Sequence, residues 1–566
     1  MFSTVCTVAV LLTVVSGVRA QTVEVTTPSG TLRGARVSMD DNYVDMYFNI
    51  PYAKPPVGDL RFRAPLANDP WDGVRNALDL GPQCPQRHND LLPWEFPNNE
   101  DCLYLNVFTP KPPESGEPMP VMVWIHGGAY YSGSGNLYDG TALAKQGVVF
   151  VAINYRLDAL GFLSTQDGNS PGNYGLLDQI RALEWVRDSI SAFNGDPSNV
   201  TICGESAGST SVSLLVMSRA AKGLFQRAIM QSGSGLSSWA MGYPRLDPRP
   251  LDVAQTLARR VNCPTDDNSR MVDCLRDKDV EVIINATTAM SKSAGVIEFK
   301  PVPETTFGQY GIFVAAPEAI MENGWFSNVS TIRGFNTEES ATLDLDPEND
   351  GMTLTEFKAK LQTLTSQYFA QSSPAVTVDT DTIQALILDA YVTQPGITKP
   401  DDLRKAFIQL ETDYFFVAPA LQELKLMTKF PVMPQYLYRF SHRSANKLGP
   451  KWTGVVHGDE LYYMFGLPIT NDTRITSFVS SWTTNDVIVS VSMVTFWTNF
   501  AKYGNPSPPL LGMEGVKWLP WTPDEPSFLD INEPLRFRPF ESLSDARYTL
   551  WTDAIPKLLR GQNLIG

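Results

Sequence analysis

A serine flanked by glycines is the residue of this chain best suited to nucleophilic chemistry. It lies in the segment Gly204-Glu205-Ser206-Ala207-Gly208, between an apolar run typical of a buried strand and a stretch compatible with a helix. This context predicts a nucleophile elbow, a sharp strand-to-helix turn that holds the serine hydroxyl out above a sheet. We therefore expect Ser206 to attack a carbonyl carbon. A G-x-S-x-G match alone is a weak signal in a chain with 40 glycines, so other motifs must support it.

Two more glycines follow an earlier strand-like run, in His126-Gly127-Gly128-Ala129-Tyr130. Glycines let the main chain approach a substrate carbonyl closely. We expect the N–H groups of Gly127 and Gly128, with that of Ala207, to converge on the oxyanion that forms during acyl transfer. The alternative is an ordinary glycine-rich turn.

A serine nucleophile needs a general base, and the chain has four histidines. His126 belongs to the glycine loop, His88 lies in a polar segment between two cysteines, and His442 follows a strand next to an arginine. His457 comes last, as the order serine, acid, histidine requires. We expect His457 to be the base. The alternative, a structural histidine, would leave Ser206 without one.

The acid must lie between these two residues, at the end of a strand. The run from Ser330 to Ser340 contains two adjacent carboxylates, Glu338 and Glu339. Adjacent side chains diverge on an extended or turning backbone, so only one of them can reach the imidazole Nδ1–H. The spacing by itself leaves both open.

With Glu100-Asp101-Cys102-Leu103-Tyr104-Leu105-Asn106-Val107, these segments resemble the type-B carboxylesterase, cholinesterase and lipase family over nearly the whole chain after the first 20 residues. The family's acid follows a G-x-N-x-x-E pattern, so the resemblance implies Glu339, with Glu338 as the fallback. Ser340 departs from the glycine that is frequent there. Long stretches look most similar to bile-salt-activated carboxyl ester lipases, although their lid-like insertion and proline-rich tail repeats are missing.

The resemblance also implies a substrate pocket. Gly295 and Ile297 stand where acetyl-specific cholinesterases carry phenylalanines, which implies room for longer acyl chains. Trp239 resembles the remaining aromatic wall, although a tryptophan there could equally belong to the core. Trp94 lies on the loop of the cholinesterase choline-site tryptophan, at a different offset, so it is a candidate for cation–π recognition. Glu205 resembles the carboxylate that cholinesterases place near the bound cation.

Cysteines and sequons suit an oxidising compartment. The resemblance implies the disulfides Cys84–Cys102 and Cys263–Cys274, with Cys203 as a buried, inert thiol. The chain also has four candidate N-glycosylation sites, at Asn199, Asn285, Asn328 and Asn471.

Strand-like and helix-like segments alternate along the chain. Apolar residues recur with helical spacing from Leu176 to Ile190, whereas the run from Val148 to Ile153 is continuously apolar, as in a strand buried on both faces. Further strand-like runs end near Met230 and Phe440. The alternation predicts an α/β-hydrolase fold, with a mostly parallel sheet between helices and the reactive groups at the carboxyl ends of the strands.

Residues 1–20 contain a short apolar run followed by Val18 and Ala20, at the −3 and −1 positions of a cleavage site. This pattern predicts a secretory signal peptide, and no later apolar stretch approaches the roughly 20 residues of a membrane span. We expect a secreted, extracellular protein without a permanent membrane anchor. No linker or repeat interrupts residues 21–566, which predicts a single domain.

Charge and composition limit the kinds of ligand that we expect this protein to bind. The net charge is −16 and no basic patch is evident, so we expect no nucleic-acid partner. With so few histidines and no ligand cluster, we expect no metal, and the proposed chemistry needs no cofactor.

The sequence therefore predicts a secreted serine hydrolase that cleaves small-molecule or lipid carboxylic esters with medium or long acyl chains. A cholinesterase-like hydrolase of choline esters is the first alternative. The second is of another class, a non-catalytic adhesion or binding member of the same family; such members typically lose a triad residue, and this chain keeps all three. The natural ester and the oligomeric state stay open.

Overall fold

A computed structural model describes most of the chain after the predicted signal peptide. The described residues are 21–39, 42–87, 96–242, 249–294, 299–304, 311–342, 345–368, 379–394, 396–470, 479–508, 517–539 and 545–559. The signal peptide, His88, Trp94, Gly295, Ile297 and Asn471 lie outside them.

The strands within these ranges form one 13-stranded sheet in the order β1-β2-β3-β5-β7-β6-β8-β9-β10-β11-β12-β13, with β4 beside β2. Their bounds are β1 Gln21–Thr27, β2 Gly30–Met39, β3 Asn42–Pro51, β4 Val74–Asn76, β5 Tyr104–Pro110, β6 Met119–Ile125, β7 Val149–Ile153, β8 Gly195–Glu205, β9 Arg227–Gln231, β10 Ser330–Asn336, β11 Gln435–Phe440, β12 Ser527–Ile531 and β13 Arg536–Pro539.

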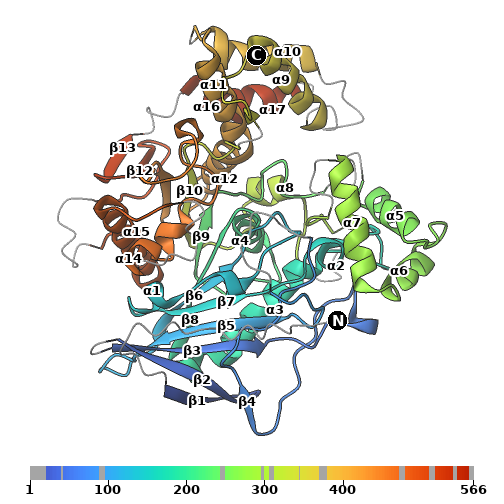
Figure 1. The fold of residues 1–566 in the computed structure, drawn as a ribbon, viewed down its shortest axis with the longest axis vertical. Coiled ribbons are helices and arrows are strands. Elements are labelled where there is room, and N and C mark those ends of the chain that lie inside the picture. Colours follow the sequence, from blue (N-terminus) through green and yellow to red (C-terminus); the bar gives the residue numbers. More distant parts are fainter. Residues whose placement is uncertain are drawn as a thin grey trace, which may run out of the picture.

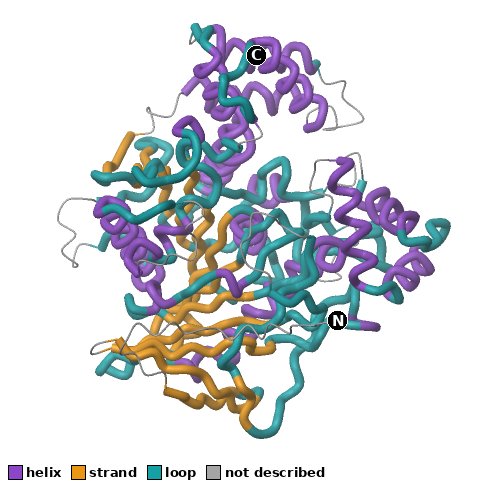
Figure 2. The backbone as a smooth tube through the Cα atoms, viewed as in Figure 1, coloured by secondary structure: helices purple, strands orange, loops and turns teal. Residues whose placement is uncertain are grey.

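Helices lie on both faces of this sheet (Figure 2). Their bounds are α1 Thr141–Ala144, α2 Asp158–Phe162, α3 Tyr174–Ser189, α4 Ala207–Met217, α5 Pro250–Arg260, α6 Asn268–Arg276, α7 Val280–Ala294, α8 Pro317–Glu322, α9 Leu354–Tyr368, α10 Thr380–Leu388, α11 Pro400–Thr412, α12 Ala418–Met427, α13 Leu461–Met464, α14 Leu467–Thr470, α15 Thr484–Tyr503, α16 Asp545–Thr549 and α17 Ile555–Leu559; a π-helical turn, η6 Asp413–Val417, joins α11 to α12.

The centre of the sheet is parallel. From β7 through β6, β8, β9, β10 and β11 to β12, every neighbouring pair runs in the same direction, while the outer pairs on both sides are antiparallel, except that the short β4 runs parallel to β2. The carboxyl ends of parallel strands meet at one edge, where an α/β sheet carries its reactive groups. The predicted α/β-hydrolase fold is confirmed, as are the helix predicted near residues 176–190, which is α3, and the strand predicted at 148–153, which is β7.

Alternate side chains of the central strands enter two different cores. Val123 on β6 packs in the core that includes residues of α3 and α4, whereas its neighbour Trp124 packs in the core that includes residues of α15. Burial of each large apolar side chain stabilises the fold by about 2 kcal/mol. The two cores hold the carboxyl ends of β6, β8 and β10 at fixed positions.

A separate helical group lies at the end of the molecule opposite β1–β4. Figure 1 shows α9, α10, α11, α16 and α17 together at the top of the view, near the C-terminus. Their apolar side chains form a third core, which includes Phe357, Leu410 and Trp551. The chain runs from this group through η6 and α12 back to the sheet, and apolar side chains of η6 and α12 share a small core with side chains of β10 and β11.

Candidate active site

Ser206 occupies the sharp turn between β8 and α4 that the sequence predicts. Its backbone has φ +57° and ψ −125°, a strained conformation for a non-glycine residue, and its N–H donates to Gln231 O at 2.9 Å. A Cβ on Gly208 would lie 2.0 Å from Ile125 O, so only glycine fits there. The Ser206 side chain is half-buried rather than enclosed. These features describe a nucleophile elbow.

The glycine loop after β6 lies directly beside this turn. A Cβ on Gly127 would be 3.0 Å from Ser206 Cβ, and Gly128 has φ +105°, which favours glycine. Among the residues that the structure describes, the N–H groups of Gly127, Gly128 and Ala207 donate to no other group. Unpaired N–H groups next to a serine are what an oxyanion hole requires.

Glu339 reaches the imidazole of His457, and Glu338 does not. Glu339 Oε2 lies 2.7 Å from His457 Nδ1, while its Oε1 accepts from Asn336 N at 2.7 Å. Glu338 instead accepts from Val455 N at 2.8 Å and so holds the turn before the histidine. The tertiary structure thus distinguishes two carboxylates that spacing alone leaves equivalent.

The other imidazole nitrogen faces a second carboxylate. His457 Nε2 lies 3.0 Å from Glu205 Oε1, and no hydrogen bond joins His457 to Ser206 Oγ in the described part of the chain. His457 Nε2 must therefore move from the Glu205 carboxylate to the Ser206 hydroxyl before it can accept a proton from the serine. Catalytic hydrogen bonds are often misaligned without substrate and tighten in the complex.

A third buried carboxylate, Glu460, completes an acidic cluster behind the histidine. Its Oε2 accepts from Asn336 Nδ2 at 2.6 Å and its Oε1 from Gln231 Nε2 at 3.2 Å. Burial raises the pKa of Glu460, and the charges of Glu205 and Glu339 raise it further. Sequence reasoning missed this residue, although it lies three positions after His457.

The same cluster controls the charge of the imidazole. Burial lowers the pKa of His457, but the carboxylates of Glu205 and Glu339 outweigh burial and raise it well above its ordinary value. Burial also raises the pKa of Glu205, while the His457 charge lowers it. The two carboxylates therefore stabilise the charged form of the imidazole.

The two other described histidines have different environments. His126 stacks on Tyr155, with ring centroids 4.4 Å apart, and burial lowers its pKa to about 4, which keeps the ring neutral. His442 Nε2 lies 2.8 Å from the buried Asp486. Neither contacts Ser206, so among the described histidines His457 is the candidate base.

Aromatic rings line one side of the site. Trp239 Nε1 donates to Phe415 O at 3.2 Å, and the Trp239 ring lies 6.0 Å from that of Phe416. The Phe416 ring is in turn 5.0 Å from the His457 ring. Phe416 lies on η6 in a segment without a motif, and sequence reasoning missed it. Of the predicted pocket residues, Trp239 is placed next to the site, whereas Trp94, Gly295 and Ile297 lie outside the described residues.

The predicted disulfides Cys84–Cys102 and Cys263–Cys274 are present. Cys203 is a free, buried thiol, and burial raises its pKa.

The candidate glycosylation sites differ in exposure. Asn285 on α7 and Asn328 are exposed, whereas Asn199 on β8 is half-buried and accepts a hydrogen bond from Arg227. No described helix has the length and apolar character that crossing a membrane requires.

Comparisons with known proteins agree with this fold. A model of the carboxylesterase family matches residues 21–551. Neuroligin-3 of Mus musculus is 34% identical over 591 residues, which covers 94% of this chain and 69% of the relative. Neuroligin-2 of Mus musculus is also 34% identical, over 588 residues, with 94% and 68% covered. These relatives do not support the narrower resemblance to bile-salt-activated lipases. The match over nearly the whole described chain shows that this protein belongs to the carboxylesterase family.

Proposed function

We propose that this protein hydrolyses carboxylic esters, with Ser206 as nucleophile, His457 as general base and Glu339 as the acid that orients it. The observation that carries the proposal is the 2.7 Å contact between His457 Nδ1 and Glu339, next to a strained elbow serine. Unpaired N–H groups at Gly127, Gly128 and Ala207 support it, because they are available to stabilise an oxyanion.

In the proposed mechanism, His457 first releases its Nε2 proton to water, and the neutral Nε2 then accepts the proton of Ser206 as the oxygen attacks the ester carbonyl. Glu339 stabilises the resulting imidazolium, and the N–H groups bind the oxyanion. The tetrahedral intermediate collapses to the acyl-enzyme, and the alcohol leaves with the proton from His457. Water then attacks the acyl carbon by the same route, which releases the acid and restores Ser206.

The aromatic wall favours esters with an apolar acyl chain. Phe416 presents ring surface beside His457 and Trp239 lies against Phe416, so an acyl chain of medium length on these rings gains about 0.8 kcal/mol for each buried methylene. A choline ester is the alternative substrate, and Glu205 would face its cation. The contact between Glu205 and His457 competes with that role.

A second candidate function, non-catalytic binding or adhesion, is favoured by a different observation. The reported relatives at 34% identity are neuroligins, and this similarity supports an adhesion role better than it supports hydrolysis. The contact that holds His457 Nε2 on Glu205, rather than on Ser206, fits the same candidate. The retained serine, histidine and glutamate support hydrolysis.

Labelling with an organophosphonate ester tests the two candidates directly. We expect the wild type to be labelled and to hydrolyse p-nitrophenyl butyrate and octanoate. Ser206→Ala should lose labelling and at least about 10⁴-fold in turnover, because the nucleophile is gone. Ser209→Ala is the matched control: its hydroxyl, one turn further along α4, donates to Gly233 O at 2.8 Å, and the variant should stay active. A folded wild type that is neither labelled nor active would favour the binding role.

We also propose that residues 1–20 are a signal peptide, that the protein is secreted, and that residues 21–566 form one domain. The family match begins at residue 21, which supports the first of these boundaries. Asn285 and Asn328, whose side chains are exposed, are the better proposed glycosylation sites.

A further inference from the structure

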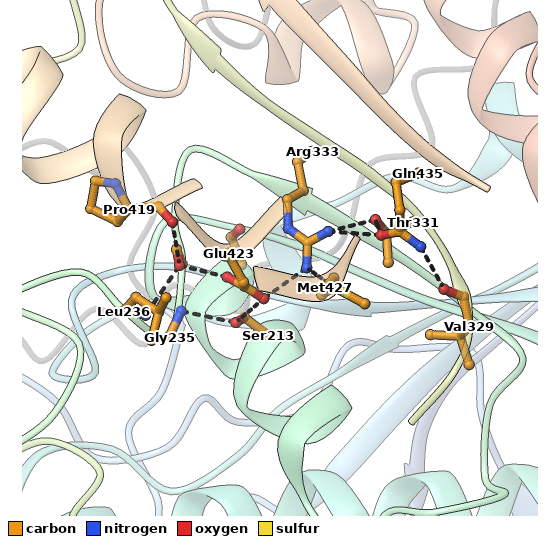
Figure 3. A network of polar contacts seen from close by, with 12 residues as sticks. Ser213, Gly235, Leu236, Val329, Thr331, Arg333, Pro419, Glu423, Met427 and Gln435 are labelled. Atoms are coloured by element: carbon orange, nitrogen blue, oxygen red, sulfur yellow. Dashed lines mark hydrogen bonds and ion pairs between the residues drawn. The ribbon is translucent and has the colours of Figure 1, made fainter. Parts of the chain in front are cut away.

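A buried ion pair connects the sheet to the helix that follows η6. Arg333 Nη2 on β10 lies 2.7 Å from Glu423 Oε1 on α12, and the two side chains are 2% and 0% exposed (Figure 3). Desolvation of two charges is costly, and a buried pair is tolerated only when hydrogen bonds satisfy its remaining donors and acceptors. The other hydrogen bonds of Arg333 and of Glu423 therefore indicate which segments of the fold the ion pair joins.

Glu423 binds two serines from two segments that follow the candidate nucleophile in the chain. Its Oε1 accepts from Ser213 Oγ at 2.9 Å, and its Oε2 accepts from Ser234 Oγ at 2.5 Å. Ser213 lies on α4, the helix that begins directly after Ser206, and Ser234 lies on the loop after β9. One carboxylate thus joins α12, α4 and this loop.

The arginine side of the pair faces the sheet instead. Arg333 Nη1 donates to Thr331 Oγ1 at 2.6 Å and to Gln435 Oε1 at 3.1 Å, on β10 and β11. Figure 3 shows these residues on one side of the ion pair and Gly235, Leu236 and Pro419 on the other. The two sides of the network can therefore be perturbed separately.

The loop that Glu423 anchors carries the aromatic wall. Gly235 N donates to Ser213 Oγ at 2.9 Å, and Leu236 N donates to Ser234 Oγ at 3.1 Å. Three residues further on is Trp239, whose Nε1 donates to Phe415 O at 3.2 Å on η6. Because η6 continues into α12, the contacts close a ring from Glu423 through the loop and Trp239 back to α12.

We propose that the Arg333–Glu423 pair, through Ser234, is a specificity-determining positioning device for acyl chains. It fixes Trp239 against Phe416 and so sets the width of the wall beside His457. The inference rests on the proposed ester hydrolysis and names which buried groups set its chain-length preference. A merely structural pair would affect stability without affecting selectivity.

Two isosteric or nearly isosteric variants distinguish a purely structural role of the ion pair from a role in chain-length selectivity. Ser234→Ala removes the direct hydrogen bond between Glu423 and the loop, while the indirect link through Ser213 remains, and Thr331→Val removes a contact of Arg333 on the sheet side. Each is compared with the wild type in kcat/KM for p-nitrophenyl butyrate and octanoate, in melting temperature, and in the ¹⁹F spectrum of protein labelled with 5-fluorotryptophan. The Trp239 resonance is assigned with Trp239→Phe.

We expect Ser234→Ala to shift the Trp239 resonance and to move the octanoate-to-butyrate ratio toward one by about fivefold, because a loosely held wall discriminates less between chain lengths. Thr331→Val should leave both readouts unchanged while lowering the melting temperature by a similar amount. An active wild type whose ratio and resonance are the same in Ser234→Ala, or changed equally by both variants, overturns the inference. A folded wild type that hydrolyses neither ester overturns the proposed function instead.

Discussion

At the scale of single residues, the chemistry of the candidate site depends on which atoms face His457. The imidazole lies between two carboxylates, at 2.7 Å from Glu339 and 3.0 Å from Glu205. Only the neutral imidazole can accept the Ser206 proton. Each carboxylate stabilises the charged ring, so Glu339 orients the base while Glu205 restrains it.

Replacing Glu205 by glutamine tests this restraint through the pH dependence of kcat/KM. In the wild type, activity should rise with pH as His457 loses its proton, at an apparent pKa that the carboxylates raise. Glu205→Gln removes one of these charges, so the pKa falls and the rising limb moves to lower pH by about one unit or more.

Glu338→Gln is the control, because Glu338 binds Val455 N and does not contact the imidazole. Its rising limb should stay at the wild-type pH. A limb that stays in place in Glu205→Gln, or moves to higher pH, would contradict the assigned role of Glu205.

At the scale of elements, four short segments build the site from different parts of the fold. The elbow, the glycine loop, the turn with Glu339 and the histidine turn follow β8, β6, β10 and β11, respectively, at the carboxyl edge of the sheet. The sequence predicts the elbow and the glycine loop because the steric constraints that require their glycines act between residues close together in the chain. The contribution of η6 is not predictable from a motif, since it depends on how α11 and α12 pack.

The disulfides should stabilise the fold by restricting the unfolded chain. The Cys263–Cys274 bridge, with a sequence separation of 11, precedes α7, and the Cys84–Cys102 bridge, with a separation of 18, precedes β5. The double variant Cys84→Ala/Cys102→Ala should lose about 3 kcal/mol and melt roughly 3 °C lower by calorimetry. Cys203→Ala, which removes a buried but unbridged sulfur, is the control and should melt close to the wild type. Equal melting of all three proteins would mean that the bridge does not stabilise the fold.

At the scale of the whole molecule, stability should be highest in the centre of the sheet. Every residue of β7 and β10 is buried, whereas β1 and β13 at the sheet edges are largely exposed. We expect amide hydrogens of β7 and β10 to exchange only through global unfolding, and those of β1 and β13 to exchange by local opening. Hydrogen exchange followed by mass spectrometry measures this difference. Equal protection of the amide hydrogens in the edge strands and in the central strands would contradict the prediction that the centre of the sheet is the most stable part.

The local motifs suffice to predict the elbow, the glycine loop, the candidate base and the α/β fold, because sharp turns and buried strands leave patterns within a few residues. The family resemblance adds the disulfides and a preference for Glu339. The tertiary structure decides what no local pattern contains: that Glu339 rather than Glu338 reaches His457, that Glu205 faces Nε2, and that Phe416 joins Trp239 at the site. It also brings Arg333 and Glu423 together across 90 positions of sequence. Such contacts depend on strand register and on helix packing, which arise only when distant segments meet.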